Sequence, residues 1–242
     1  MKRIGLIGGL SPESTVHYYE ILCREYNDKF GELNFPEITI QSLNLQKLVE
    51  LFGKNDWDGV ASILLDAIHR LKGAGAEFAA ILANTPHNAY DKIRDQSPLE
   101  ILTIMDATSA VLLRDERRKV GLLGTQATME FGFFQKYFTS HNIETLTPDA
   151  SQRQELDRII WKELSHGVIK AESRLAAKEM IDDLIKEDVQ AVILGCTELS
   201  LLIKPEDSSR PLYDTTQIHA KAILEFSLQN ADRFMAEKGG VR

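Results

Sequence analysis

The sequence lacks the features that mark secreted, metal-binding and membrane proteins. It has only two cysteines, Cys23 and Cys196, and no CxxC pair, so it offers neither a disulfide framework nor a cysteine zinc site. Its 6 histidines show no HxH or HxxxH spacing, so a histidine metal site has no support. No apolar run approaches the ~18 residues of a membrane helix, and Met1 does not open a signal-peptide core. These absences predict a cytoplasmic protein without a metal or a membrane partner.

Basic charge and nucleotide motifs are also scarce. Lys and Arg total 28 against 36 for Asp and Glu, which gives a net charge of −8, and no basic run alternates with aromatic residues. A nucleic-acid partner is therefore not expected. The turn Gly5-x-x-Gly8-Gly9 lacks the GxGxxG spacing, and no GxxxxGK motif occurs, so NAD and nucleotide phosphates are not expected either. No cofactor is predicted. The glycine pair is either a tight strand-to-helix turn or a loop that also lines a ligand cleft, together with Ser11.

What the sequence does contain is an alternation of short apolar runs and helical patterns. Apolar strands that alternate with helices are typical of a parallel α/β sheet covered on both faces. The predicted strands of the first half span 4–7, 38–43 and 78–82, and a helix is predicted over 57–71.

The first helix has a clear predicted start. Ser11 is placed as its N-cap, followed by a proline at the first helical position and an acidic residue in the first turn. The apolar stripe through Val16, Tyr19, Leu22/Cys23 and Tyr26 predicts the buried face, and it puts Cys23 in the core.

Two similar halves follow one another along the chain. Residues 118–125 (RKVGLLGT) echo residues 2–9 (KRIGLIGG), and residues 191–197 (AVILGCT) echo residues 79–85 (AAILANT). The fold predicted from these repeats is α/β, with two pseudo-symmetric lobes that each hold a short parallel sheet flanked by helices. Open parallel sheets bind ligands at the carboxyl ends of their strands, so the cleft between the lobes is the expected active site. The first predicted lobe comprises 1–103 plus 211–242, because the final helix at 215–226 should return to it. The second predicted lobe comprises 104–210.

Two strand ends carry residues suited to chemistry. Cys196 follows the apolar run 191–194 and precedes a short helical pattern at 199–203. A thiol at a helix N-terminus is expected to have a pKa below ~8.5, so Cys196 is a candidate acid/base rather than a packing residue. His87 follows the other strand end, where it is either a hydrogen-bonded residue at a helix start or a proton-transfer group.

With these strand ends in view, the sequence resembles the aspartate/glutamate racemase family, whose members racemise amino acids without pyridoxal phosphate. The resemblance spans nearly the whole chain and implies two α/β lobes, an active site between them and a homodimer. It rests on five blocks in the expected order: GGLSPEST at 8–15, ANTPH at 83–87, LLGTQATME at 122–130, GCTEL at 195–199 and YDTTQIHA at 213–220.

The family mechanism that this resemblance implies needs one acid/base group on each face of the α-carbon. The usual pair is two cysteines, since a thiol can act as base or as acid near neutral pH. Cys196 matches the second cysteine, whereas Ala83 stands where the first belongs. Two-thiol racemisation is therefore excluded, and His87, Thr85 or a water is left to supply the opposite face.

The resemblance also implies a set of substrate-binding residues. These would anchor the α-carboxylate and stabilise the charge that develops on it when the α-proton leaves. Lys47 is a candidate for a distal carboxylate, although Leu48 and Phe52 beside it suggest a less acidic pocket. The implied binders are Ser11, Lys47, Asn84, Thr85, Thr125, Thr128, Thr197 and Glu198.

Three hypotheses about function follow. The first is a cofactor-independent racemase-type enzyme acting on a small amino acid or related carboxylate, with Cys196 as its surviving acid/base. The second is a single-thiol lyase or isomerase on the same fold, as in the related arylmalonate decarboxylases. The third is an amino-acid-binding protein without catalysis. Ala83 argues against the first, and the polar Thr197 and Glu198 beside Cys196 argue against the third.

Overall fold

The computed structural model describes residues 1–229 and divides them into two compact units. The first unit comprises Met1–Leu82, Ala89–Thr103 and the chain from His219 onward, and the second comprises Ala83–Asn88 and Ile104–Ile218. Residues 230–242, which the sequence assigns to the first lobe, lie outside the described residues.

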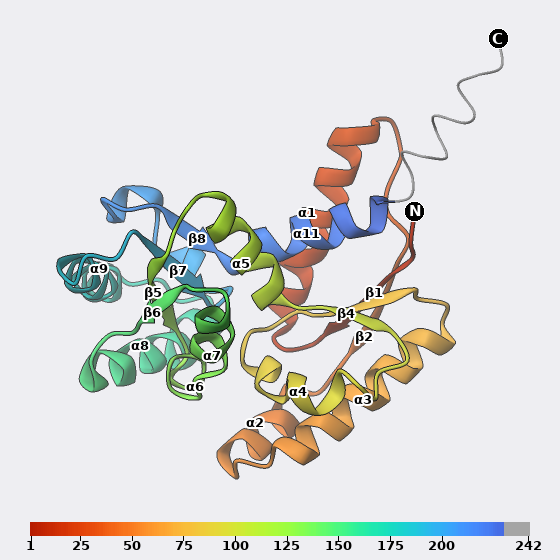
Figure 1. Ribbon diagram of the computed structural model, residues 1–242, viewed down its shortest axis with the longest axis horizontal. Helices are drawn as coiled ribbons and strands as arrows, with labels where there is room; N and C mark the ends of the chain where they lie inside the picture. The colour runs from red at the N-terminus through yellow and green to blue at the C-terminus, as the bar shows by residue number, and fades with distance from the viewer. Residues whose placement is uncertain (230–242) are drawn as a thin grey trace. The chain divides into compact units, whose positions relative to one another are not determined.

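A parallel four-stranded sheet forms the centre of the first unit (Figure 1). Its strand order is β2-β1-β3-β4, and Ile4 of β1 pairs with Ile38 on one side and with Phe78 on the other. Every residue of β1 and β3 is buried, as expected for central strands of a parallel sheet. The strands are β1 (Ile4–Gly8), β2 (Ile38–Ser42), β3 (Phe78–Ile81) and β4 (Glu100–Leu102).

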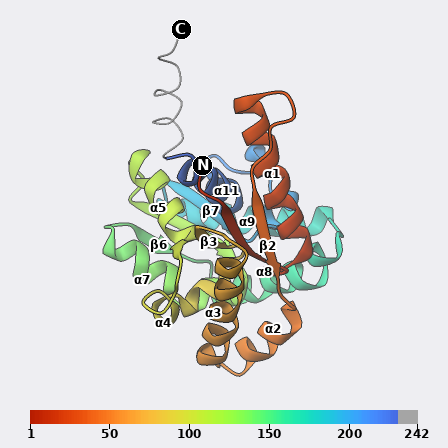
Figure 2. The same cartoon turned by 90° about the vertical axis from the view of Figure 1, so that its right-hand side faces the viewer.

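Helices cover both faces of this sheet (Figures 1 and 2). Alternate residues of β1 point to opposite faces: Leu6 packs with α1 and α11, whereas Gly5 approaches Leu71 of α3. His219 of α11 holds the first face together, because its ring nitrogens lie 3.0 Å from the Tyr18 hydroxyl and 3.0 Å from the Leu102 carbonyl oxygen. The helices of this unit are α1 (Pro12–Phe30), α2 (Leu45–Gly53), α3 (Trp57–Gly73), α4 (Tyr90–Ile93) and the body of α11 (Thr215–Leu228).

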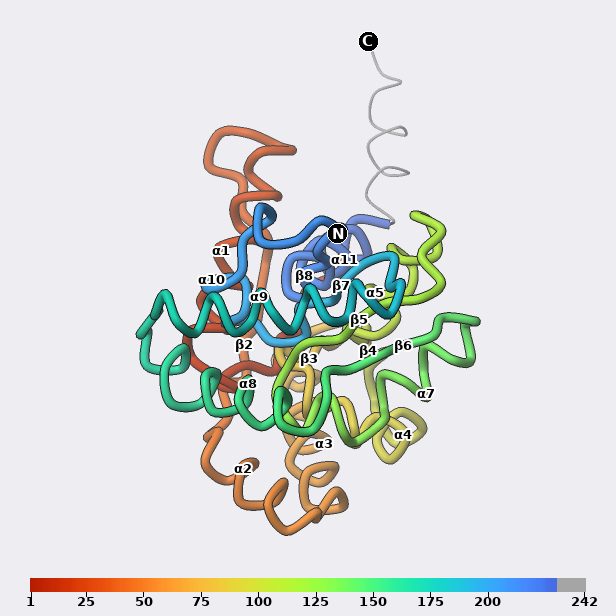
Figure 3. The backbone as a smooth tube through the Cα atoms, turned by 90° about the vertical axis from the view of Figure 1, so that its left-hand side faces the viewer, coloured from red at the N-terminus to blue at the C-terminus, as the bar shows by residue number. Residues whose placement is uncertain are grey.

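The second unit repeats the plan. Its parallel sheet has the order β6-β5-β7-β8, which is the order of the first sheet shifted by four strands. Helices α8 and α9 run side by side across one face and bury its main apolar core (Figure 3). The strands are β5 (Lys119–Gly124), β6 (Glu144–Leu146), β7 (Ala191–Gly195) and β8 (Leu212–Asp214). The helices are α5 (Ile104–Arg114), α6 (Gln126–Glu130), α7 (Phe133–Ser140), α8 (Ala150–Lys162), α9 (Ala171–Lys186) and α10 (Leu199–Leu202), with single 3-10 turns η1 (Thr85–Ala89), η2 (Leu164–His166) and η3 (Pro205–Asp207).

The predicted fold class is confirmed, since both sheets are parallel and flanked by helices. The division of the chain differs from the predicted lobes in two places. Residues 211–218 belong to the second unit, because β8 pairs with β7 before α11 enters the first unit. The segment 83–88 also belongs to the second unit, although it directly follows β3.

The first helix begins as predicted but turns a different face inward. Ser11 caps α1 by accepting a hydrogen bond from the Ser14 amide at 3.2 Å. The predicted stripe is right for Leu22, which is buried, and for Tyr26, which packs against the core, but wrong for Val16, which is 57% exposed, and for Tyr19, which is 47% exposed. The buried residues are Ser14, Tyr18, Ile21 and Leu22, and the bond between Tyr18 and His219 fixes this orientation of the helix. Cys23, predicted to be core, is half-buried at the edge of this face.

No helix within residues 1–229 is long and apolar enough to cross a membrane.

Candidate active site

The ends of two neighbouring strands bring the candidate residues of the second unit together. Gly124 of β5 pairs with Gly195 of β7, so the residues that follow them, Thr125 and Cys196, leave the sheet side by side. The two glycines permit this close approach. A Cβ on Gly195 would lie 2.9 Å from the Leu123 carbonyl oxygen, and one on Gly124 would lie 3.1 Å from the Gly195 carbonyl oxygen. Because both glycines lack a side chain, the ends of β5 and β7 pack closely, and the polar residues Thr125 and Cys196 come next in the chain after the two strands.

Three threonine hydroxyls meet in a triangle. The Oγ1 atoms of Thr85 and Thr125 lie 3.3 Å apart, those of Thr85 and Thr128 lie 3.2 Å apart, and those of Thr125 and Thr128 lie 3.0 Å apart. Thr125 is also the N-cap of α6 and accepts a hydrogen bond from the Thr128 amide. Each hydroxyl can turn its proton toward an anion, so the triangle is a ready set of donors for a carboxylate.

Asn84 presents an oxygen without a hydrogen-bond donor. Its Nδ2 lies 3.3 Å from Thr215 Oγ1, and the Thr215 hydroxyl donates its single proton to the Leu194 carbonyl at 2.9 Å. Thr215 must therefore accept from Asn84, which fixes nitrogen and oxygen of the amide. Asn84 is only 6% exposed, and no donor within residues 1–229 reaches its Oδ1. A ligand that carries an N–H or O–H donor would satisfy this atom.

His87 is engaged through both ring nitrogens. Its Nε2 accepts a hydrogen bond from the Ile104 amide at 3.3 Å, the first amide of α5, so Nδ1 carries the proton and donates it to the Ala83 carbonyl at 2.8 Å. The ring is buried, and burial lowers its pKa to about 4. The geometry supports the structural interpretation from the sequence rather than proton transfer, because the ring is neutral and has no nitrogen left for a substrate.

The Cys196 thiol is half-buried and donates a hydrogen bond to Glu198, with 2.9 Å between Sγ and Oε2. Burial against the apolar core raises the pKa of the thiol well above its ordinary value, and the carboxylates of Glu198 and Asp157 raise it further. The predicted lowering of this pKa by a helix dipole is wrong. Helix α10 has only four residues, and its N-cap residue is itself the acidic Glu198. At neutral pH the resting group is therefore the thiol.

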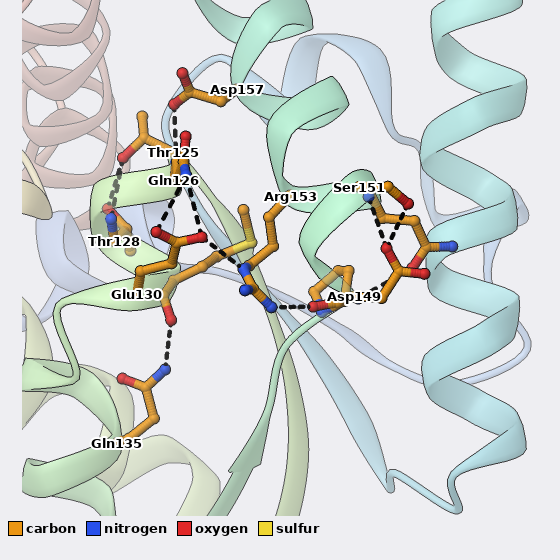
Figure 4. Close-up of polar contacts among 12 residues, drawn as sticks. Thr125, Gln126, Thr128, Glu130, Gln135, Asp149, Ser151, Arg153 and Asp157 are labelled. Atoms are coloured by element: carbon orange, nitrogen blue, oxygen red, sulfur yellow. Dashed lines mark hydrogen bonds and ion pairs between the residues drawn. The ribbon is translucent and has the colours of Figure 1, made fainter.

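A polar network holds α6 and its threonines in place (Figure 4). The Asp157 carboxylate accepts a hydrogen bond from the Gln126 amide at 2.8 Å, and the Gln126 side chain donates to Glu130. Arg153 closes the network through a 2.9 Å ion pair with Glu130. Helix α6 has only five residues, and Asp157 and Arg153 of α8 hold its first and last residues.

The predicted site residues are divided between the units. Asn84, Thr85, His87, Thr125, Thr128, Cys196, Thr197 and Glu198 all belong to the second unit. Ser11 and Lys47 belong to the first unit, where Ser11 caps α1 and Lys47 lies on the exposed side of α2.

Sequence reasoning missed two residues of this site. Thr215 lies in the YDTTQIHA block, which marked the family resemblance but gave no role to this position. Asp157 stands within α8, and nothing in the local pattern distinguishes it from a surface carboxylate. Only the tertiary contacts reveal their partners, Asn84 and the start of α6. Within residues 1–229, no cluster of three or more His, Cys, Asp or Glu side chains could hold a metal ion.

Comparison with known proteins agrees with this architecture. The family described as Asp/Glu/Hydantoin racemase matches residues 7–223. A broad-specificity amino-acid racemase from Bacillus subtilis is 22% identical over 226 residues, which cover 90% of this chain and 95% of that protein.

Two solved structures are similar over nearly their whole length. A crystal structure of a putative Asp/Glu racemase from Yersinia pestis is 40% identical, has a TM-score of 0.89 and is matched over 95% of this chain and 100% of that chain. An aspartate racemase homologue from Pyrococcus horikoshii is 36% identical, has a TM-score of 0.82 and is matched over 94% of this chain and 99% of that chain.

Proposed function

Because the chain belongs to the Asp/Glu/Hydantoin racemase family, we propose that it is a cofactor-independent racemase-type enzyme that acts at the α-carbon of a small amino acid. Cys196 is its one thiol acid/base. The observation that carries this proposal is that Cys196 and Thr125, one corner of the threonine triangle, directly follow paired residues at the adjoining ends of β7 and β5.

The polar groups of the second unit match the two ends of an amino acid's α-carbon. The hydroxyls of Thr85, Thr125 and Thr128 are donors for the α-carboxylate. Removing the α-proton moves negative charge onto that carboxylate, and donors already in place stabilise the charge without reorganisation. The buried Oδ1 of Asn84 needs a donor, which an α-ammonium group supplies. This last feature favours an amino acid over a carboxylate that lacks an amine.

The absence of a thiol at position 83 limits the reaction. Ala83 has no proton to give, and the ring nitrogens of His87 are committed to the Ala83 carbonyl and the Ile104 amide. Cys196 can remove and return a proton only on its own face of the α-carbon. We therefore expect rapid exchange of the α-hydrogen in one enantiomer and slow inversion, since each ~1.4 kcal/mol of extra barrier costs tenfold in rate.

The test is incubation of each enantiomer of aspartate and glutamate in heavy water, with the α-proton followed by NMR and configuration by chiral chromatography. Fast exchange with retention in one enantiomer, abolished in Cys196→Ser, is the expected result. A broader set of amino acids follows if these two fail. If Cys196→Ser exchanges as fast as the wild type, or if no amino acid exchanges, the proposal is wrong.

One observation favours a second activity. The raised pKa keeps Cys196 protonated at neutral pH, and a resting thiol suits the protonation of a carbanion formed by loss of another group. A single-thiol lyase would work in this way. It would release a second product from a carbon acid, so mass analysis of the same incubations distinguishes it from exchange and inversion.

A further inference from the structure

Helix α6 and its N-cap carry two of the three hydroxyls that the proposed function gives to the substrate carboxylate, yet this helix has only five residues. A helix of little more than one turn has too few internal hydrogen bonds to be stable alone. The direction of the hydroxyl at its start, on Thr125, therefore depends on groups outside the helix. The Thr128 amide donates to that hydroxyl at 3.2 Å, so this bond reports whether Thr125 is in place.

Asp157 is the outside group that holds the start of α6. Its Oδ1 accepts a hydrogen bond from the Gln126 amide at 2.8 Å (Figure 4). Gln126 is the first residue of the helix, and the amides of a first helical turn have no acceptor within the helix. Two side chains thus satisfy the start of α6, because the Thr125 hydroxyl accepts from the Thr128 amide and the Asp157 carboxylate accepts from the Gln126 amide.

The support behind Asp157 is rigid. The residue stands on α8, a helix of 13 residues that is anchored in the core of the second unit by Leu156, Ile159 and Ile160. A carboxylate acceptor also makes a stronger hydrogen bond than a neutral one. The other contact from α8 reaches Glu130, at the opposite end of α6. Of these two contacts, the one made by Asp157 adjoins Thr125.

We propose that Asp157 is a positioning residue for substrate binding: by holding the first amide of α6, it keeps the Thr125 hydroxyl aimed at the α-carboxylate and so sets the affinity of the site for the amino acid. This inference rests on the proposed function of the threonine triangle. Thr125 makes two of the three contacts of that triangle, one to Thr85 and one to Thr128. A start of α6 that is free to move would release both contacts. Because Asp157 acts through α6, it is not a catalytic residue.

The charge of Asp157 has a second effect, which the test must separate from the hydrogen bond. The carboxylate also raises the pKa of the Cys196 thiol. Asp157→Asn removes the charge but keeps an oxygen that can accept from the Gln126 amide, whereas Asp157→Ala removes both. A property that the Ala variant loses and the Asn variant retains therefore depends on the hydrogen bond.

Amide hydrogen exchange, followed by NMR at neutral pH without substrate, tests the hold on Thr125. In Asp157→Ala the Thr128 amide should exchange about tenfold faster or more, because its bond to the Thr125 hydroxyl opens when the start of α6 is free. Asp157→Asn should protect this amide as the wild type does. Gln154→Ala is the matched control, because Gln154 is an exposed residue of α8, and it should leave the exchange rate unchanged.

The kinetics of α-hydrogen exchange in heavy water test the consequence for binding, with the amino acid that the wild type exchanges fastest. Asp157→Ala should raise KM about tenfold, and Asp157→Asn should have the KM of the wild type. A merely structural role would behave differently. It would lower the amount of folded enzyme, and hence the maximal rate, and would leave KM unchanged.

The outcomes separate this inference from the proposed function. A Thr128 amide that stays protected in Asp157→Ala overturns the inference, and so does a KM that does not rise or that Asp157→Asn fails to restore. If Asp157→Ala does not fold, Asp157→Ser takes its place, because its hydroxyl is too short to reach the Gln126 amide. Protection that is lost in the Ala variant and kept in the Asn variant, with no amino acid exchanged by the wild type, keeps the hold of Asp157 on Thr125 and refutes the proposed function.

Discussion

The buried imidazole of His87 should make the protein lose stability in mild acid. The ring donates to the Ala83 carbonyl and accepts from the Ile104 amide, and it fixes the segment that carries Asn84 and Thr85. In the folded protein its pKa is about 4, whereas an unfolded histidine titrates near 6.5. At a pH between these two pKa values, the His87 ring is protonated in the unfolded chain and neutral in the folded chain. The free energy of unfolding therefore falls as the pH drops through this window.

The size of this effect follows from the two pKa values. A difference of about 2.5 pH units at ~1.4 kcal/mol per unit corresponds to about 3 kcal/mol of stability, present above pH 6.5 and lost by about pH 4. For a folded protein with a net stability of ~5–15 kcal/mol this loss is large. The same protonation breaks the acceptor bond to Ile104, because Nε2 can no longer accept.

The assay is urea unfolding of the wild type and of His87→Gln at several pH values between 7.5 and 4.5. Glutamine cannot titrate, so the difference in unfolding free energy between the two proteins should shrink by about 3 kcal/mol toward the acidic end. His69→Gln serves as the control, because His69 lies exposed on α3. An NMR titration of the His87 ring should give a midpoint near pH 4. A constant difference across the pH range, or a ring that titrates near 6.5, would refute the reasoning.

Three further predictions concern the site and its support. Thr215→Val removes the hydroxyl that accepts a hydrogen bond from Asn84, so the rate of α-hydrogen exchange should fall about tenfold through a higher KM. The conservative Thr215→Ser keeps a hydroxyl and should exchange at the wild-type rate. Equal rates in both variants would contradict this role. Ala83→Cys supplies a thiol at the position that the family motif gives to the first catalytic cysteine. Inversion of aspartate or glutamate should therefore appear or increase, and it should vanish in Ala83→Cys/Cys196→Ser. Glu163 is paired with Arg158 at 2.8 Å and Lys170 at 3.2 Å, and its hydrogen bond from Ser173 and these cations lower its pKa to about 2. The contribution of Glu163 to stability is therefore present above about pH 4.5 and lost toward pH 2. Glu163→Gln should lower the Tm by several degrees at pH 7, and this difference should disappear near pH 2. A Tm equal to that of the wild type at pH 7 would rule out this role.

The sequence alone determines the plan of the molecule. Short apolar runs alternating with amphipathic patterns predict a parallel sheet covered on both faces, and the central strands β1 and β7 are indeed buried along their whole length. The echo between residues 2–9 and 118–125 predicts two similar units, and the matching strand orders confirm this similarity. Local chemistry also determines where α1 begins, since Ser11 and Pro12 act within one turn.

Only the tertiary structure decides which face of α1 is buried and how the site residues are charged. The apolar pattern of α1 allows more than one buried face, and the contact of Tyr18 with His219, 201 residues away, selects one. The Cys196 thiol has the sequence neighbours of an activated cysteine, but burial in the folded protein raises its pKa most, Glu198 two residues on raises it further, and Asp157 of α8 adds to this. His87 likewise becomes a structural residue because of the Ile104 amide. Protonation depends on the solvent exclusion and charges around a group, and the tertiary structure decides which residues supply them.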